Sequence, residues 1–420
     1  MDCITNAQAK SRKNSLWRHP DFLKLWVGQT VSELGSRITR EGLPLTAVLV
    51  LGAGPAQMGL LAATGAASVL LFGLVAGLWT DRLKRRPILI AADLLRAAVL
   101  AAIPLAAWAH RISMPQLYGA IAVAGLGTVF FDVAYQSYLP SLVRREELVE
   151  GNSKLAQSDA IAEIVGPSLT GVLVQLITAP VAILFDSASF LVSAVSVWTI
   201  RKPEPAAQTA SCSHWKKETM AVLRFIFGHP VLRPLASFSA CGHFFFGFIG
   251  TLYVLYAIRD LRVPPAALGA AITVGGLGAM LGAAVAPRVA RALGRVFVGS
   301  MAVAVLSLGL LAIAGGPLPA VLALLMIQQL FGDAAFAVFN VNELALRQSV
   351  TPAQVLGRVN GAMQLLTRGI YPLGALVGGA LAERIGIRGT LAVAAGGLAV
   401  SSLWLLAPPL RKLSAIPGAG

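Results

Sequence analysis

Residues Gly77 to Pro87 read GLWTDRLKRRP, and five of the six residues from Asp81 to Arg86 are charged. An apolar run precedes this cluster and another follows it. Apolar stretches of about 20 residues, each long enough to cross a bilayer as a helix, recur along the whole chain. The charged cluster is therefore expected to be a short loop between two membrane-spanning helices.

The composition also indicates a membrane protein. Hydrophobic residues make up 56% of the 420 residues and charged residues only 13%, whereas about a quarter of an average soluble domain is charged. Lipid offers the backbone no hydrogen-bond partners, so the fold class is predicted to be all-α. The net charge of +15 would suggest a nucleic-acid partner in a soluble protein. Here the basic residues lie in short segments between spans, so no nucleic-acid partner is expected.

Glycine, proline and charged residues that interrupt the apolar runs predict twelve transmembrane helices. They lie near 22–50, 57–80, 88–109, 116–139, 152–177, 180–200, 231–257, 265–287, 296–314, 317–342, 358–382 and 388–408. The N-terminal tail and alternate loops hold most of the Lys and Arg residues. The other loops hold only Arg111, Arg259, Arg262, Arg384 and Arg388. Because cytoplasmic loops are rich in Lys and Arg, both termini are predicted to be cytoplasmic, in a multi-pass protein of a bacterial-type inner membrane.

The longest polar stretch, RKPEPAAQTASCSHWKK from Arg201, follows the sixth predicted span. We interpret it as a linker between two six-helix bundles, 1–200 and 231–420. The linker region, 201–230, includes a predicted surface helix from Trp215 to Phe227. The three scattered cysteines predict neither a disulfide framework nor a metal site, and no cofactor is expected.

The two halves repeat three short patterns. His19-Pro20 recurs as His229-Pro230, and the other pairs are Leu148-x-x-x-Asn152 with Leu356-x-x-x-Asn360 and Arg82-x-x-Arg85 with Arg288-x-x-Arg291. The offsets between copies fall between 206 and 210 residues. Two parallel six-helix repeats are typical of secondary transporters.

The motif Gly77-x-x-x-Asp81-Arg82-x-x-Arg85-Arg86 resembles the loop signature of the major facilitator superfamily. DFLKLWVGQTVSELGSRIT from Asp21, FFDVAYQSYLPSLV from Phe130 and GRVNGAMQ from Gly357 resemble the exporter branch that holds macrolide efflux pumps and the enterobactin exporter. The resemblance covers nearly the whole chain. It implies the major facilitator fold and alternating access, with spans 1, 4, 7 and 10 around a central cavity.

The resemblance also implies that the loop signature locks the cytoplasmic side when the transporter faces outward. Asp132 lies eight residues before Pro140, about 12 Å of helix, which places it within reach of an arginine from that loop. The predicted gate comprises Gly77, Asp81, Arg82, Arg85, Arg86 and Asp132. The alternative is that the basic cluster only anchors the loop at the membrane surface.

Charged side chains inside a span are costly and normally face the bundle interior or a wet cavity. Span one holds Glu33, Arg37, Arg40 and Glu41 on one helical face. We interpret this stripe as a substrate and proton contact, with a self-neutralising ladder as the alternative. Asp333 of span ten is a further cavity candidate. His243 follows Glu33 by 210 residues and is either a cavity residue or a neutral core histidine.

Other intramembrane polar residues have expected structural roles. Glu343 and Arg347 are predicted to form an interfacial ion pair, and Asp93 and Arg96 a structural pair near the cytoplasmic boundary. Arg368 is expected to find a partner on another helix. Span five contains Glu163-x-x-Gly166-Pro167-x-x-x-Gly171, which partly resembles the Gly-Pro motif of family antiporters and predicts a closely packed helix pair.

The sequence thus predicts a monomeric secondary transporter in membrane lipid, not an enzyme. It is expected to export amphiphilic or aromatic small molecules, such as a drug, an antibiotic or a siderophore-like metabolite, in exchange for protons. No GxxxxGK(S/T) loop occurs, so direct drive by ATP is not expected. The alternatives are a proton-coupled importer and a membrane enzyme acting on lipid-linked substrate.

Overall fold

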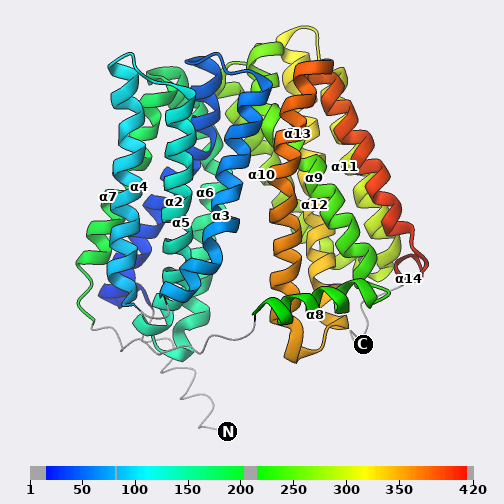
Figure 1. The fold of residues 1–420 in the computed structure, drawn as a ribbon, viewed down its shortest axis with the longest axis horizontal. Helices are drawn as coiled ribbons and strands as arrows, with labels where there is room; N and C mark the ends of the chain where they lie inside the picture. Colours follow the sequence, from blue (N-terminus) through cyan, green and yellow to red (C-terminus); the bar gives the residue numbers. More distant parts are fainter. Residues whose placement is uncertain (1–15, 81–82, 203–214, 414–420) are drawn as a thin grey trace.

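The computed structural model describes residues 16–80, 83–202 and 215–413 (Figure 1). The first group of helices consists of α2 (Pro20–Leu49), α3 (Pro55–Thr80), α4 (Arg85–Trp108), α5 (Met114–Leu142), α6 (Leu148–Ile177) and α7 (Ala179–Trp198). After α8 (Trp215–Gly228) come α9 (Leu232–Leu255), α10 (Pro265–Val289), α11 (Leu293–Ile313), α12 (Leu318–Val350), α13 (Ala353–Ser402) and α14 (Pro408–Arg411). Within these ranges no strand is present.

Short helical segments join several of these helices. They are η1 (Leu16–Arg18), η2 (Arg145–Glu147), the π-helical η3 (Tyr256–Asp260), η4 (Ala290–Ala292) and η5 (Leu403–Leu406).

The helix α13 consists of two spans. Gly386 interrupts it with φ 78° and ψ 164°, a backbone conformation that only glycine adopts readily. Figure 1 shows the chain turning back there, so that the orange and red parts of α13 run in opposite directions. The break falls between the predicted spans 358–382 and 388–408.

Helices are present for all twelve predicted spans. By length and hydropathy, nine segments of the described chain qualify as membrane spans. Two of these, Pro265–Ile313 and Ala353–Leu406, each contain two spans. The helix α2 is missing from the nine because six of its residues are charged. A single hydropathy criterion therefore undercounts the spans.

The helices form two bundles. In the first, α2 packs on α6 and α7, α4 packs on α5 and α7, and α3 packs on α5. In the second, α9 packs on α13, α10 packs on α12, and α11 packs on α12 and α13. The main contacts between bundles are α3 with α13 and α6 with α10. The predicted fold class, two six-helix bundles, is confirmed.

The two ends of the molecule need names. We call the end on which α8 lies the α8 face and the opposite end the far face (Figure 1). Val222 and Ile226 of α8 are buried against the second bundle, whereas Met220 is exposed. The predicted helix over 215–227 is thus present as α8. The predicted boundaries of the bundles and linker stay predictions, since 203–214 lie outside the described residues.

The repeated His-Pro pairs begin the first helix of each bundle. Nδ1 of His19 accepts a hydrogen bond from the Phe22 N–H at 3.1 Å. Nδ1 of His229 accepts from the N–H groups of Val231 and Leu232 at 3.2 and 3.3 Å. Burial lowers the pKa of His229, which favours the neutral ring that can accept these bonds. The repeat therefore preserves a helix cap.

Candidate transport site

Two arginines of α2 are held by carboxylates of α6. Nη2 of Arg37 lies 2.6 Å from Oδ1 of Asp159, and its Nη1 contacts the Glu163 carboxylate. Nη2 of Arg40 lies 2.9 Å from Oε1 of Glu163, and its Nε lies 3.3 Å from Oε1 of Glu41. The stripe predicted on span one therefore pairs mainly with another helix.

We call these six residues the α2–α6 charge cluster: Glu33, Arg37, Arg40, Glu41, Asp159 and Glu163. It holds four carboxyl groups and two guanidinium groups, so it can accept protons or a cation without losing every ion pair. The sequence interpretation missed Asp159 and treated Glu163 only as part of a packing motif. The signal was present, because two carboxyl groups four residues apart in an apolar span share one helical face.

Glu33 is the carboxylate of the cluster with the weakest described ion pair. Its Oε2 lies 3.9 Å from Nη2 of Arg37, while the same nitrogen lies 2.6 Å from Asp159. The Glu33 side chain is 41% exposed, compared with 15% for Arg37. Glu33 is thus partly accessible and incompletely neutralised.

Asp333 of α12 extends this charge arrangement into the second bundle. Its carboxylate interacts electrostatically with Glu163 and Arg40 of the first bundle. Gly275 of α10 leaves the space that the carboxylate occupies, because a Cβ there would overlap Oδ2 of Asp333. The prediction that Asp333 faces the same region as the span-one stripe fits this geometry.

A cavity of about 520 Å³ lies between the two bundles. Its lining includes Arg40, Glu41, Pro44, Met58, Leu61, Ala62, Ala66, Ile121, Ile249, Gly250, Thr251, Tyr253, Val254, Ile272, Gln329 and Tyr371. We call it the central cavity. Apolar side chains dominate it, with a few polar groups that can orient a ligand, which is typical of small-molecule sites.

Two polar side chains of this lining are buried without a partner. The hydroxyl groups of Thr251 and Tyr253 make no hydrogen bond within the described parts of the chain. Thr251 is 1% exposed and Tyr253 is 9% exposed. Buried hydroxyl groups are normally hydrogen-bonded, so this pair provides donors and acceptors for a bound molecule.

His243 makes local contacts. Its Nδ1 lies 2.8 Å from the carbonyl oxygen of Ser239 on the same helix. Its ring lies 6.1 Å from that of Phe246 and 6.3 Å from that of Phe336. It is not among the residues that line the central cavity. A cavity role for His243 stays a prediction.

The predicted gate is only partly described. Gly77 lies in α3, and Asp81 and Arg82 lie outside the described residues. The Arg86 guanidinium donates to the Trp198 carbonyl. The Asp132 carboxylate interacts electrostatically with Arg96 and Arg368, residues outside the loop signature. A pairing of Asp132 with the loop stays a prediction.

The bundles approach each other closely where α6 crosses α10 near the far face. A Cβ at Gly171 would overlap the carbonyl oxygen of Pro265, and one at Gly269 would overlap that of Pro167. Oε1 of Gln175 accepts a hydrogen bond from the Ala266 N–H at 3.2 Å. We call this contact the α6–α10 crossing.

A second crossing joins α3 and α13 in the same way. A Cβ at Gly59 would lie 2.6 Å from the carbonyl oxygen of Ala375, and one at Gly379 would lie 2.6 Å from that of Pro55. Oε1 of Glu383 accepts from the Ala56 N–H at 3.2 Å. This α3–α13 crossing was not predicted, although its residues lie 208 to 210 positions from their counterparts in the α6–α10 crossing.

The predicted Gly-Pro motif of span five connects the α6–α10 crossing to the charge cluster. Pro167 and Gly171 face α10, whereas a Cβ at Gly166 would overlap the side chain of Arg37. The small residues therefore let α6 approach α2 and α10 at once.

Two of the predicted structural pairs are present. Nη2 of Arg96 contacts the Asp93 carboxylate, and both residues are buried. Nη1 of Arg347 lies 3.2 Å from Oε1 of Glu343. The expected partner of Arg368 on another helix is Asp132, through an electrostatic interaction between the bundles.

The sequence model of the Major Facilitator Superfamily matches residues 25–371. The chain belongs to the major facilitator superfamily. It is 29% identical to the multidrug efflux pump Tap of Mycolicibacterium fortuitum over 416 residues, which cover 94% of this chain and 97% of Tap. It is 27% identical to macrolide efflux protein A of Streptococcus pyogenes over 210 residues, 48% of this chain and 51% of that protein.

A solved major facilitator fold resembles this one closely. A bacterial homologue of the iron transporter ferroportin, in an inward-facing state, has a TM-score of 0.77 at 18% identity. The match covers 95% of this chain and 100% of the ferroportin homologue. This likeness shows the fold alone. Membership of the family confirms that the chain is a small-molecule transporter embedded in a membrane, and that it is not an enzyme.

Proposed function

We propose that this major facilitator transporter exports amphiphilic or aromatic small molecules, of the drug, antibiotic or siderophore class, in exchange for protons. The central cavity carries this proposal. Its lining combines apolar side chains with Arg40, Glu41 and the unpartnered hydroxyls of Thr251 and Tyr253. The similarity to Tap and to macrolide efflux protein A supports export and a drug-like substrate.

The cycle proposed here alternates access between the two faces. The α8 face is the cytoplasmic one, because the loops there hold most of the basic residues. In this structure the two crossings join the bundles near the far face, and α3 and α13 diverge toward the α8 face (Figure 1). Substrate therefore enters from the cytoplasm, and opening of both crossings releases it outside.

The loop signature acts in the opposite state. When the crossings open, the α8 ends of the bundles approach, and the gate of Gly77, Asp81, Arg82, Arg85, Arg86 and Asp132 stabilises that closure. Arg368 already interacts electrostatically with Asp132 across the bundles. Asp132 therefore exchanges cationic partners as the cytoplasmic side closes.

Glu33 carries the proton in this scheme. It is accessible, and its ion pair with Arg37 is longer than that of Arg37 with Asp159. Protonation of Glu33 therefore removes a weak attraction while leaving the α2–α6 pairing intact. Glu33 does not line the central cavity as Arg40 and Glu41 do, so in this scheme it exchanges its proton through the exposed part of its own side chain.

The test is Glu33→Gln in the full-length protein reconstituted in proteoliposomes. Because glutamine retains size and hydrogen bonding, substrate counterflow should stay within about twofold of wild type. Transport driven by a proton gradient should fall by about tenfold or more, because the titrating group is lost. Glu146→Gln, a change at an exposed carboxylate of η2, is the matched control and should leave both activities unchanged.

Loss of counterflow and driven transport together would give Glu33 a structural or substrate-binding role. Retention of both would exclude it as the proton carrier. Uptake into everted vesicles that collapses with an uncoupler would support export, and energised uptake into right-side-out vesicles would support the importer alternative.

A further inference from the structure

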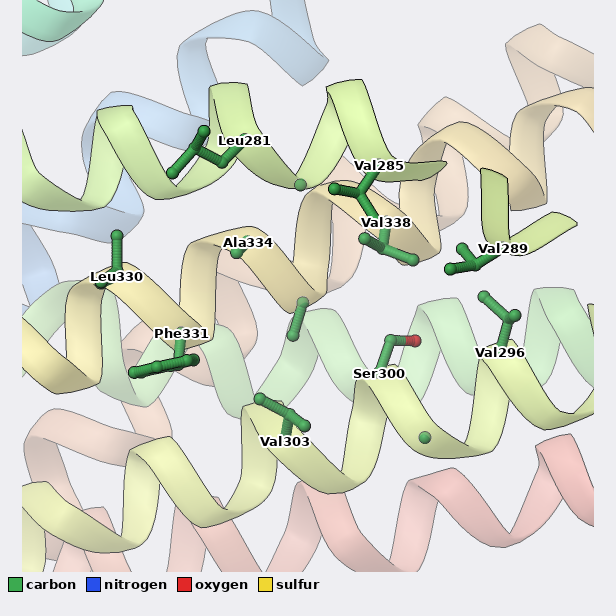
Figure 2. A pocket seen from close by; sticks show the side chains of 13 residues that line it. Leu281, Val285, Val289, Val296, Ser300, Val303, Leu330, Phe331, Ala334 and Val338 are labelled. Atoms are coloured by element: carbon green, nitrogen blue, oxygen red, sulfur yellow. The ribbon is translucent and has the colours of Figure 1, made fainter. Parts of the chain in front are cut away.

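A long apolar groove runs along the outside of the second bundle. Figure 2 shows α10 and α11 as its walls and α12 between them. Its volume is about 450 Å³. The lining includes Leu281 and Val289 of α10, Val296, Gly299 and Ser300 of α11, and Phe331 of α12. The Ser300 hydroxyl is the one polar side-chain group in this lining.

The groove opens toward lipid and is separate from the central cavity. Leu281 is 54% exposed and Phe331 is 52% exposed, and the two cavities share no lining residue. Along α10 the groove extends from Val289 to Leu281, about 12 Å of helix rise. One leaflet of the hydrocarbon core is about 15 Å thick. The groove therefore spans most of the leaflet next to the α8 face.

Three exposed arginines lie where α10, η4 and α11 meet, next in the chain to the residues that line the α8 end of this groove. Arg288, Arg291 and Arg295 lie between the lining residues Val289 and Val296 or beside them. Nη1 of Arg288 donates to the Ala284 carbonyl at 2.9 Å, which holds the side chain along α10. No acidic residue occurs in the sequence between Asp260 and Asp333, and Glu343 at this end of α12 is paired with Arg347, so this end carries a net positive charge.

We propose that the groove binds one anionic phospholipid. An acyl chain occupies the apolar groove, and the phosphate pairs with the guanidinium groups of Arg288, Arg291 and Arg295. Arginine binds phosphate through charge-assisted hydrogen bonds, and cationic clusters beside a span attract anionic lipid. A neutral apolar ligand would use the groove without these arginines.

The binding test uses full-length protein in bilayers that contain phosphatidylglycerol or phosphatidylcholine with a diazirine in one acyl chain. After illumination, mass spectrometry maps the labelled peptides. The phosphatidylglycerol probe should label residues 281–303 at least about fivefold more than the phosphatidylcholine probe. Equal labelling by both probes, or label spread evenly over all lipid-facing helices, would refute the proposal.

Two glycines of α11 provide a matched pair of variants. A Cβ at Gly299 or at Gly309 would meet no atom within 4 Å, so both sites accept a larger side chain. Gly299 lines the groove and Gly309 does not. Gly299→Phe should reduce acyl-chain labelling by about tenfold, because the ring fills the groove, whereas Gly309→Phe should leave it unchanged. Full labelling of Gly299→Phe would contradict the proposed chain position.

The headgroup contact is tested separately at exposed positions. The double change Arg291→Gln with Arg295→Gln should abolish the preference for phosphatidylglycerol while chain labelling persists. A preference that survives would place the phosphate elsewhere. These experiments measure lipid binding and not transport, so their outcome is independent of the proposed substrate and coupling ion.

Discussion

The α6–α10 and α3–α13 crossings have the same architecture, and they differ in tightness. At each, two glycines meet backbone carbonyl groups of the other bundle and a side chain caps the neighbouring helix. An added Cβ would come within 2.6 Å of oxygen in the α3–α13 crossing, and closer still in the α6–α10 crossing. The α6–α10 crossing therefore has less room for an added side-chain atom than the α3–α13 crossing.

Their surroundings differ as well. Beside the α6–α10 crossing, Gly166 packs on Arg37, which is held by Asp159 and Glu163. Charge changes in the α2–α6 charge cluster therefore act directly on the position of α6. The corresponding stretch of α13 carries Arg368 and Tyr371, and Tyr371 packs against Gly250 of its own bundle. The two crossings thus differ in their charges: the α6–α10 crossing adjoins the α2–α6 charge cluster, and the α3–α13 crossing has a charged cap, Glu383, of its own.

The largest expected effect is the sidedness of thiol labelling, which shows whether the crossings close the outer or the cytoplasmic side of the transporter. In a background in which Cys3, Cys212 and Cys241 are replaced, Lys84→Cys lies at the α8 face and Arg262→Cys lies at the far face. An impermeant thiol reagent should label Lys84→Cys only from the cytoplasm and Arg262→Cys only from outside. Labelling of both from one side would overturn the twelve-span topology.

The next effect compares the glycines. Gly269→Ala should shift the population toward the state open at the far face, because overpacking of the crossing costs about 1–3 kcal/mol. This cost corresponds to a change of roughly 5- to 150-fold in the population ratio of the two states. Gly59→Ala should shift it less, since its Cβ has more room. The measurement is the labelling rate of Gln329→Cys, a cavity residue, from the outside.

The control for this comparison is Gly309→Ala, where a Cβ meets no atom within 4 Å. It should leave the labelling rate of Gln329→Cys unchanged. A larger effect of Gly59→Ala than of Gly269→Ala would reverse the proposed order of the two crossings.

The smallest effect concerns the caps. A negative charge at a helix N-terminus stabilises it by about 0.3–1 kcal/mol, and salt screens this. Glu383→Gln should therefore loosen the α3–α13 crossing by about two- to fivefold in the same labelling assay, and Gln175→Glu should tighten the α6–α10 crossing by a similar factor. Both effects should diminish in high salt. If both variants changed the labelling rate in the same direction, charge would not be what distinguishes the two caps.

The sequence predicted the helices well because membrane spans are long apolar runs and glycine, proline or charged residues mark their ends. Gly386 separates two spans at the expected place. The predicted span 317–342 was too short, since α12 continues to Val350. The predicted ion pair of Glu343 and Arg347 lies within the continued part of this helix.

The site was predictable only within single helices. Helical periodicity placed Glu33, Arg37, Arg40 and Glu41 on one face of α2, because the spacing of residues in one helix is fixed. Their partner Asp159 depends on the depth and rotation of α6 relative to α2, which no local pattern encodes. The α3–α13 crossing was within reach, since the repeat offset applied to Gly171 leads to Gly379.

The charge of α2 also has a consequence for synthesis and membrane insertion. This helix precedes α6 in the chain and therefore leaves the ribosome earlier, and a charged residue at the centre of a span costs about 2.5–3.5 kcal/mol on insertion. Arg37 and Asp159, its partner, are 122 residues apart. At about 5–20 residues per second, roughly 6–24 s pass before α6 is made. During that interval α2 needs protection from lipid at the insertion machinery, so maturation of the nascent protein waits for its fifth span.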